Sequence, residues 1–238
     1  MKSELVVFEQ ISPHSSARQS EVIDHVALHC VVGQCTAESL GAHFALDATK
    51  ASSNYGVDKD GRVSLHVDES RRAHTTGGNK PAVNGITGSM IDHRAITIEV
   101  ASDAFEPYAI TDAAYEGLIR LLVDICQRQP AIGRLRWQGD PAFVGQPDKQ
   151  NIAVHRWFAY KKCPGDYIYD RLGDIAAEVN RRLDAAEMDN EPAAWAKEAV
   201  EWATSNGIMR GNEKGNLRLR DNITREEMCV MLHRALEV

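Results

Sequence analysis

The chain lacks the features that mark several special classes of protein. No apolar run in its 238 residues approaches the roughly 18 residues that a membrane span requires. Its net charge of −7 argues against a nucleic-acid partner, because phosphate binding needs clustered Lys and Arg. The five cysteines are odd in number and scattered, so they form no disulfide framework. Each cysteine is therefore considered as a core, metal-binding or catalytic residue.

The N-terminal segment also lacks the core of a signal peptide. Its apolar patch, LVVF, is too short for one, so we expect synthesis in the cytoplasm without a signal peptide. Hydrophobic residues make up 43% of the chain and charged residues 26%, which predicts a packed soluble core.

A change of composition divides the chain near DAAEMDNEPAAWA, residues 184–196. A helical pattern ends there, a short acidic link with a proline follows, and a new pattern begins. This predicts a first domain at 1–185, a linker at 186–192 and a small helical module at 193–238. The sequence has no internal repeat.

The first domain alternates strand patterns with helix patterns. Asp60-Gly61 supplies a hairpin turn, and Thr111 can cap a helix. The predicted elements are strands at 25–30 and 94–100, a hairpin at 53–67 and helices at 111–130 and 165–184. Interleaved strands and helices predict an α/β fold with a mixed central sheet flanked by helices.

The stretch HRWFAYKKCPG places His155 eight positions before Cys163, which follows two lysines. Cys163 could be a reactive thiol, a metal ligand or an ordinary buried cysteine. As a ligand it would pair with His155 on one loop, since zinc binds both thiolate and imidazole. Lys161 and Lys162 would then favour the thiolate form of Cys163.

A catalytic zinc site needs a third protein ligand, and His29 is the best candidate because it lies at the end of a predicted strand. Cys30 would point to the opposite face and belong to the core. Glu99 lies on the polar face of its strand, where a general base beside a metal-bound water would explain it. Taken singly, His29 could be structural and Glu99 an ion-pair partner.

The segments DHVALHC, SSNYGVDKDGRV, AITIEV and KKCPGDYIYDRL resemble, in this order, the zinc-dependent N-acetylmuramoyl-L-alanine amidases of the amidase-2 type. That family includes phage lysins and the peptidoglycan recognition proteins. The resemblance covers roughly residues 20–184. It implies an amidase-2 fold and hydrolysis of the amide between N-acetylmuramic acid and L-alanine of peptidoglycan by a zinc-activated water.

The same resemblance assigns roles to individual residues. It implies that His29, His155 and Cys163 bind Zn²⁺, with Glu99, Lys161 and Tyr55 as catalytic residues. Glu99 would be the general base, while Lys161 or Tyr55 would steady the oxyanion. The family's Trp-His-x-Gly patch reads RRAHTTGGNK here, which gives His74 a role in substrate binding.

The tail from WAKEAVEWA through NGIMRG to ITREE resembles an S-layer homology module. Thr224 and Glu227 form a capping box in the sequence, and Gly207 ends the preceding helix. Such modules commonly bind cell-wall polysaccharide and occur in three copies. The resemblance implies that this single copy either binds wall glycan, associates between chains as a homo-oligomer, or only packs. The residues it implicates are Trp195, Gly207, Gly211 and Arg225.

Two other functions compete with a cell-wall-lytic amidase of the endolysin or autolysin type. One is a muropeptide-binding module without catalysis, and the other is a cysteine hydrolase with Cys163 as nucleophile and His155 as base. The amidase interpretation predicts action at the bacterial cell wall after release, with another protein providing passage through the membrane.

Overall fold

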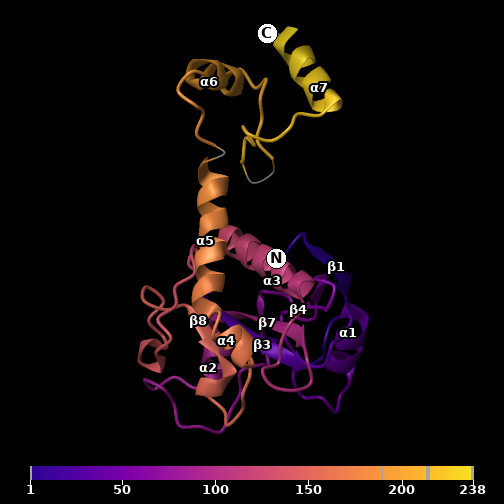
Figure 1. Ribbon diagram of the computed structural model, residues 1–238, viewed down its shortest axis with the longest axis vertical. Helices are drawn as coiled ribbons and strands as arrows, with labels where there is room; N and C mark the ends of the chain where they lie inside the picture. The colour runs from indigo at the N-terminus through magenta and orange to yellow at the C-terminus, as the bar shows by residue number, and fades with distance from the viewer. Residues whose placement is uncertain (1, 189, 213–214, 237–238) are drawn as a thin grey trace. The chain divides into compact units, whose positions relative to one another are not determined.

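The structure is a computed structural model that describes residues 2–188, 190–212 and 215–236 (Figure 1). The chain divides into two compact units, Met1–Asn180 and Arg181–Val238, and each is described by itself. The division falls inside α5 (Leu172–Met188), a little before the predicted domain limit at residue 185. No helix in the described ranges is long and apolar enough to cross a membrane.

A six-stranded sheet forms the centre of the first unit, in the order β1-β5-β4-β7-β3-β8. β4 and β5 pair antiparallel and the other neighbours pair parallel, so the predicted mixed sheet is confirmed. A separate two-stranded sheet joins β2 and β6. The strands are β1 (Val6–Glu9), β2 (Ser15–Ala17), β3 (His25–Val32), β4 (Tyr55–Val57), β5 (Val63–Leu65), β6 (Arg71–Ala73), β7 (Ala95–Ser102) and β8 (Ile152–Val154).

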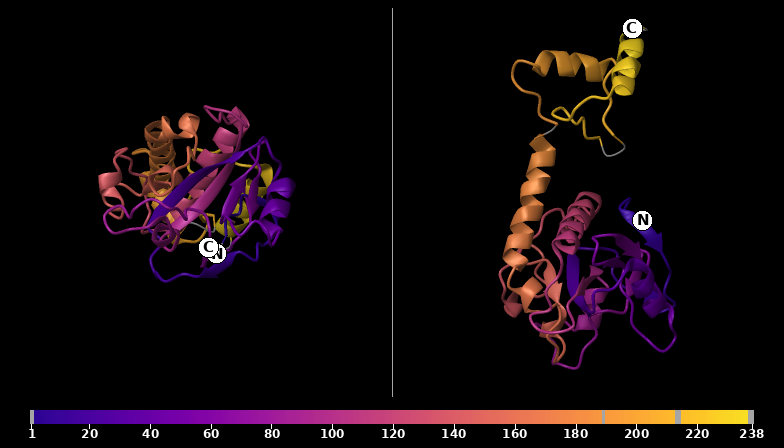
Figure 2. Two further views of the ribbon diagram at one scale, coloured as in Figure 1. Left: turned by 90° about the horizontal axis from the view of Figure 1, so that it is seen from below. Right: turned by 45° about the vertical axis from the view of Figure 1, so that its right-hand side comes forward.

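Helices cover both faces of the central sheet. α1 packs so closely on β4 that a Cβ on Gly56 would lie 2.5 Å from Leu40 Cδ2. The opposite face is covered by α3, which lies beside the first part of α5 in Figures 1 and 2. The remaining helices of this unit are α1 (Ala37–Ala45), α2 (Gly88–Asp92), α3 (Asp112–Arg128), α4 (Asp166–Tyr169) and the short 3-10 turns η1 (Pro141–Phe143) and η2 (His155–Trp157).

The predicted elements of the first unit are present. The hairpin turns at Gly61, whose φ of 76° suits glycine, and Thr111 caps α3 through a 3.0 Å bond from the Ala114 amide. The helix expected at 165–184 is divided into α4 and α5, because the chain turns between Asp170 and Arg171. Its predicted core residues are all buried: Ile168, Leu172, Ile175, Val179 and Leu183.

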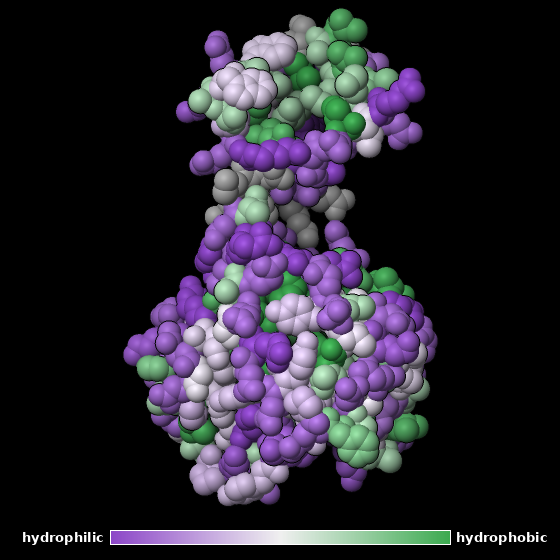
Figure 3. All heavy atoms as spheres, in the orientation of Figure 1, coloured by the Kyte–Doolittle hydropathy of each residue, from purple (hydrophilic) through white to green (hydrophobic). Residues whose placement is uncertain are grey.

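The second unit contains α6 (Lys197–Ser205) and α7 (Arg225–Leu236). Gly207 follows α6 with a φ of 69°, and Thr224 and Glu227 exchange the two bonds of the predicted capping box, at 2.8 and 3.1 Å. Ile208 is the only buried apolar residue among the described residues of 190–236. Figure 3 shows apolar side chains at the surface of this unit.

Candidate metal centre

Strand register brings the two histidines together. β3 pairs in parallel with β8 so that Leu28 lies opposite Val154, and each is followed at once by a histidine, His29 or His155. Parallel strands end at the same edge of a sheet, so both imidazoles reach the same side of that edge. Their ring centroids lie 5.2 Å apart.

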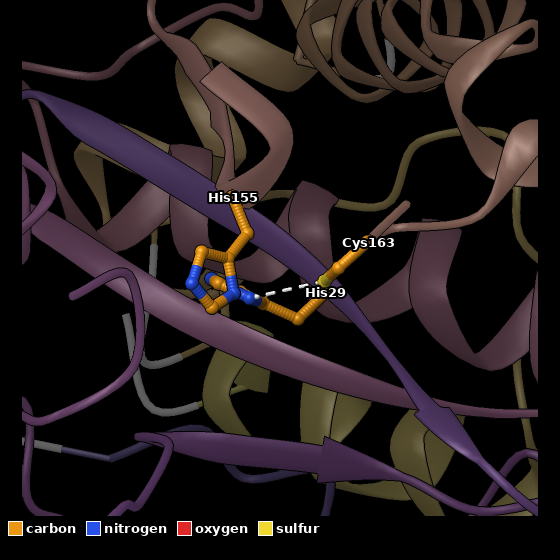
Figure 4. Close-up of side chains that lie close together, drawn as sticks. All are labelled: His29, His155 and Cys163. Atoms are coloured by element: carbon orange, nitrogen blue, oxygen red, sulfur yellow. Dashed lines mark hydrogen bonds between the residues drawn. The ribbon is translucent and has the colours of Figure 1, made fainter. Parts of the chain in front are cut away.

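Cys163 joins this pair from the loop that follows η2. A 3.0 Å bond from the Arg156 amide to the Cys163 carbonyl folds the loop back. The Cys163 Sγ then lies 3.3 Å from His29 Nδ1, and the donor atoms of the three residues all lie within 4.8 Å of one another (Figure 4). The zinc bond lengths of about 2.0 to 2.3 Å correspond to roughly 3.3 to 3.6 Å between ligands of one tetrahedral ion. The cluster is therefore close to the size that zinc requires.

The second nitrogen of each histidine contacts one short loop, residues 75–77. His155 Nε2 lies 2.8 Å from the Gly77 carbonyl, which can only accept, so Nε2 carries the proton and Nδ1 has a free lone pair. His29 Nε2 lies 3.2 Å from Thr76 Oγ1, which leaves Nδ1 facing Cys163. Metal-binding histidines usually have such a partner on their other nitrogen.

Burial keeps the histidines neutral. It lowers the pKa of His29 well below its ordinary value and also lowers that of His155, and the positive charge of Lys161 contributes to both shifts. A neutral imidazole is the form that binds a metal ion.

The thiol of Cys163 differs from the expectation. Its pKa is raised well above the ordinary value, first by a side-chain hydrogen bond with Cys30 and then by burial. Lys162 is exposed and pairs with Glu106 at 3.0 Å, so it does not hold Cys163 as thiolate. The prediction that Cys30 belongs to the core is also wrong, since Cys30 is half-buried beside Cys163. A metal ion would have to displace the thiol proton on binding.

Glu99 lies directly across from His29 in the β3–β7 register, on the same face of the sheet. Its Oε2 is buried without a hydrogen-bond partner. Burial raises the pKa of Glu99 to about 8, the negative charge of Cys30 adds to the shift, and Lys161 opposes it. Lys161 is itself exposed, so a mobile positive charge lies near both histidines and the carboxylate.

Tyr55 does not belong to this site, which corrects the sequence-based prediction. It pairs with Ile98, one residue before Glu99, and therefore points to the opposite face of the sheet. Its hydroxyl donates to Glu69 Oε1 at 2.6 Å and accepts from the Ser3 amide at 2.9 Å. Glu69 in turn pairs with Arg128 of α3 at 2.8 Å. Tyr55 thus belongs to a buried structural network.

His74 lies just before the 75–77 loop and is half-buried, with its amide bonded to Ser52 Oγ at 3.0 Å. Its substrate contact stays a prediction. In the second unit a cavity of about 1160 Å³ is lined by Trp195 and Gly211 but not by Gly207 or Arg225. The predicted tail residues therefore do not all face one cavity.

Sequence reasoning missed the residues around the ligands. Thr76 and Gly77 contact the histidines and Cys30 contacts Cys163, yet none of them has a spacing that indicates such a role. The run Thr-Thr-Gly-Gly at 75–78 was the available signal, because two adjacent glycines indicate a close backbone approach.

Comparison with known families decides the identity. The N-acetylmuramoyl-L-alanine amidase model Amidase_2 matches residues 18–166, more than half of the chain. The chain belongs to this family. It is an amidase that hydrolyses the bond between N-acetylmuramic acid and L-alanine of peptidoglycan, which confirms the function that the resemblance implied. The S-layer homology domain model matches residues 188–229.

Solved structures agree with the fold of this amidase. A crystal structure of an AmpD derivative has a TM-score of 0.52 at 19% identity and covers 71% of this chain and 93% of its own. The solution structure of the PlyG catalytic domain has a TM-score of 0.45 at 15% identity, covering 74% and 94%. The Drosophila peptidoglycan recognition protein SD has a TM-score of 0.42 at 15% identity, covering 66% and 87%. No curated protein matches the chain.

The position of Tyr55 generates a prediction that separates a structural role from a catalytic one. Tyr55→Phe leaves Glu69 and the Ser3 amide without their buried partner, so we expect a loss of about 1 to 3 kcal/mol in the free energy of unfolding. Well below the unfolding temperature, kcat/KM should stay within about threefold of wild type, because the hydroxyl is remote from the metal centre. Urea unfolding and a muropeptide assay measure the two effects.

Tyr167→Phe, at a half-buried tyrosine outside this network, is the control and should change neither quantity. A hundredfold fall in kcat/KM for Tyr55→Phe with unchanged stability would restore the catalytic assignment.

Proposed function

We propose that this amidase is a zinc enzyme whose metal is held by His29 Nδ1, His155 Nδ1 and Cys163 Sγ. The observation that carries the proposal is the cluster itself, with three donor atoms within 4.8 Å and the second nitrogen of each histidine already bonded to the 75–77 loop. Two imidazoles and one thiolate suit zinc, and three protein ligands leave a fourth position open for catalysis. Zinc at such a site lowers the pKa of water and polarises a carbonyl.

We propose Glu99 as the general base. Its carboxylate lies across from His29, and its buried Oε2 has no other partner to satisfy. A cation at the ligand cluster would counter the rise in the pKa of Glu99 and favour the carboxylate. Glu99 can then accept a proton from the water that attacks the amide carbonyl and later return it to the leaving L-alanine nitrogen.

We propose that Lys161 stabilises the negative charge that develops on the amide oxygen. Its charge already influences the pKa of His29, His155 and Glu99, so its ammonium group is within electrostatic reach of the reacting atoms. His74 would contact the substrate beside the 75–77 loop. Tyr55 has no part in this scheme.

The cysteine-hydrolase alternative fits the geometry poorly. Cys163 contacts His29 rather than His155, and the raised pKa of its thiol opposes thiolate formation. His155 Nε2 donates to the Gly77 carbonyl. Neither histidine is therefore arranged to activate a cysteine nucleophile.

We propose that the second unit binds cell-wall polysaccharide and brings the amidase to the bacterial wall, where it acts after release. Its cavity combines an indole, from Trp195, with Arg210 at its wall, and such a mixture of aromatic and cationic groups suits an anionic glycan. Self-association through this unit would place its exposed apolar side chains, such as Leu232 and Leu236, between chains.

Metal content tests the zinc site. The wild-type protein should contain about one zinc per chain by elemental analysis, lose activity to a strong chelator and regain it with zinc. His29→Ala should lose both metal and activity. His25→Gln is the matched control, because His25 is a buried histidine on the same strand outside the cluster. A zinc-loaded but inactive His29→Ala protein would refute the ligand assignment.

Substitution of Glu99 tests the general base. Glu99→Gln preserves the shape of the side chain and leaves all three metal donors in place, so we expect full zinc content with kcat reduced on the order of 10²- to 10⁴-fold. New L-alanine amino ends released from peptidoglycan measure the rate. Near-wild-type kcat would remove Glu99 from the mechanism, and loss of zinc would instead make it a ligand.

Trp195→Ala tests the wall-binding role in the full-length protein. We expect it to weaken sedimentation with intact sacculi by about tenfold while kcat/KM on soluble muropeptide is unchanged, because Trp195 lies in the second unit. Trp202→Ala is the control, since Trp202 is an exposed tryptophan of α6 outside the cavity lining. Equal binding of wild type to sacculi with and without their secondary polysaccharide would contradict glycan recognition.

A further inference from the structure

Both proposed histidine ligands are oriented by one loop, and that loop is held by a buried carboxylate far along the chain. We propose that Asp92 is a positioning residue for the metal centre, acting on His29 and His155 through Thr75, Thr76 and Gly77. The inference rests on the proposed zinc site and adds to it a residue that the family match and the cluster do not assign.

The contacts of Asp92 are directed at the backbone of this loop. Its Oδ2 accepts from the amides of Thr75 and Thr76 at 3.1 and 3.0 Å, and its Oδ1 accepts from the Thr76 amide at 3.1 Å. The side chain has no exposed surface. Hydrogen bonds to a charged acceptor inside a protein are stronger than neutral ones, so this carboxylate fixes the position of the Thr76 backbone.

Thr76 and Gly77 transmit that position to the metal ligands. The Thr76 hydroxyl bonds His29 Nε2 and the Gly77 carbonyl bonds His155 Nε2, at 3.2 and 2.8 Å. One carboxylate therefore governs, through two adjacent residues, the ring orientation of two ligands that come from different strands. A shift of the loop would turn both Nδ1 atoms away from a shared ion.

Close packing leaves the loop no alternative position. A Cβ on Gly88 of α2 would lie 1.8 Å from the Thr76 carbonyl oxygen, and a Cβ on Gly78 would lie 2.0 Å from the Phe158 carbonyl oxygen. Phe158 belongs to the turn that begins at His155, and its amide bonds the His155 carbonyl at 2.9 Å. The loop is thus enclosed between α2, which carries Asp92, and the segment that carries His155.

The end of α2 is itself anchored to the sheet. Arg18 donates to the Asp92 carbonyl at 2.8 Å and to the Ala95 carbonyl of β7 at 2.9 Å. The Asp92 carboxylate is consequently fixed relative to the strand that carries Glu99. The general base and both histidines share one frame of reference.

Zinc affinity tests this proposal, with a matched buried carboxylate as control. Asp58 is also fully buried and accepts three amide bonds, from Ala37, Asp60 and Arg62, but its loop contacts neither histidine. We expect Asp92→Ala to raise the Kd for zinc 10- to 100-fold, as loss of an outer-shell partner typically does, and Asp58→Ala to leave it within threefold. Asp92→Asn should recover part of the affinity, because its amide oxygen can still accept from the loop.

Competition of the folded apoproteins with a chromophoric chelator measures the zinc Kd, and the visible spectrum of the cobalt-substituted proteins reports ligand geometry. A Kd for Asp92→Ala within threefold of wild type overturns the inference, as does an equal rise for Asp58→Ala. If Asp92→Ala does not fold, Thr76→Val decides, since it removes only the oxygen that bonds His29 Nε2. A rise of at least threefold supports the proposal, and an unchanged Kd refutes it. Wild type that binds no zinc would instead refute the metal centre itself.

Discussion

The parallel pairing of β3 with β7 and β8 is the constraint on which the rest of the site depends. It sets His29 between Glu99 on one side and the strand that leads into His155 on the other. Residues far apart in sequence thereby reach one edge of the sheet without help from long flexible loops. A slip of one residue in either register would turn His29 to the opposite face, toward the buried layer under α3.

The electrostatics of the centre favour neutral groups until a cation arrives. Burial lowers the pKa of His29 and His155 and raises that of Glu99, while the hydrogen bond with Cys30 and burial raise that of Cys163. All four groups are thus in their uncharged forms near neutral pH. A bound divalent cation reverses the balance for the thiol and the carboxylate, so metal binding and proton release are linked.

Much of the fold and the ligand set could be predicted from sequence, because each depends on local pattern. Alternation identified β7, a cap identified α3, and the spacing of His155 to Cys163 indicated two donors on one loop. The errors arose where the answer depends on the pairing of distant segments. Tyr55 sits next to the right strand, but the face of its side chain follows from its pairing with Ile98, which no local pattern reveals.

The two units differ in how they are stabilised, and this difference bears on what each can do. The first has a continuous core on both sides of its sheet, so it can hold buried, unpaired groups such as Glu99 in place for chemistry. In the described part of the second unit only Ile208 is buried, while side chains of α7 such as Leu232 remain exposed. So small a core contributes little free energy of folding by itself. Any ligand that binds only the folded form of this unit therefore also stabilises it, which makes the unit better suited to attachment than to catalysis.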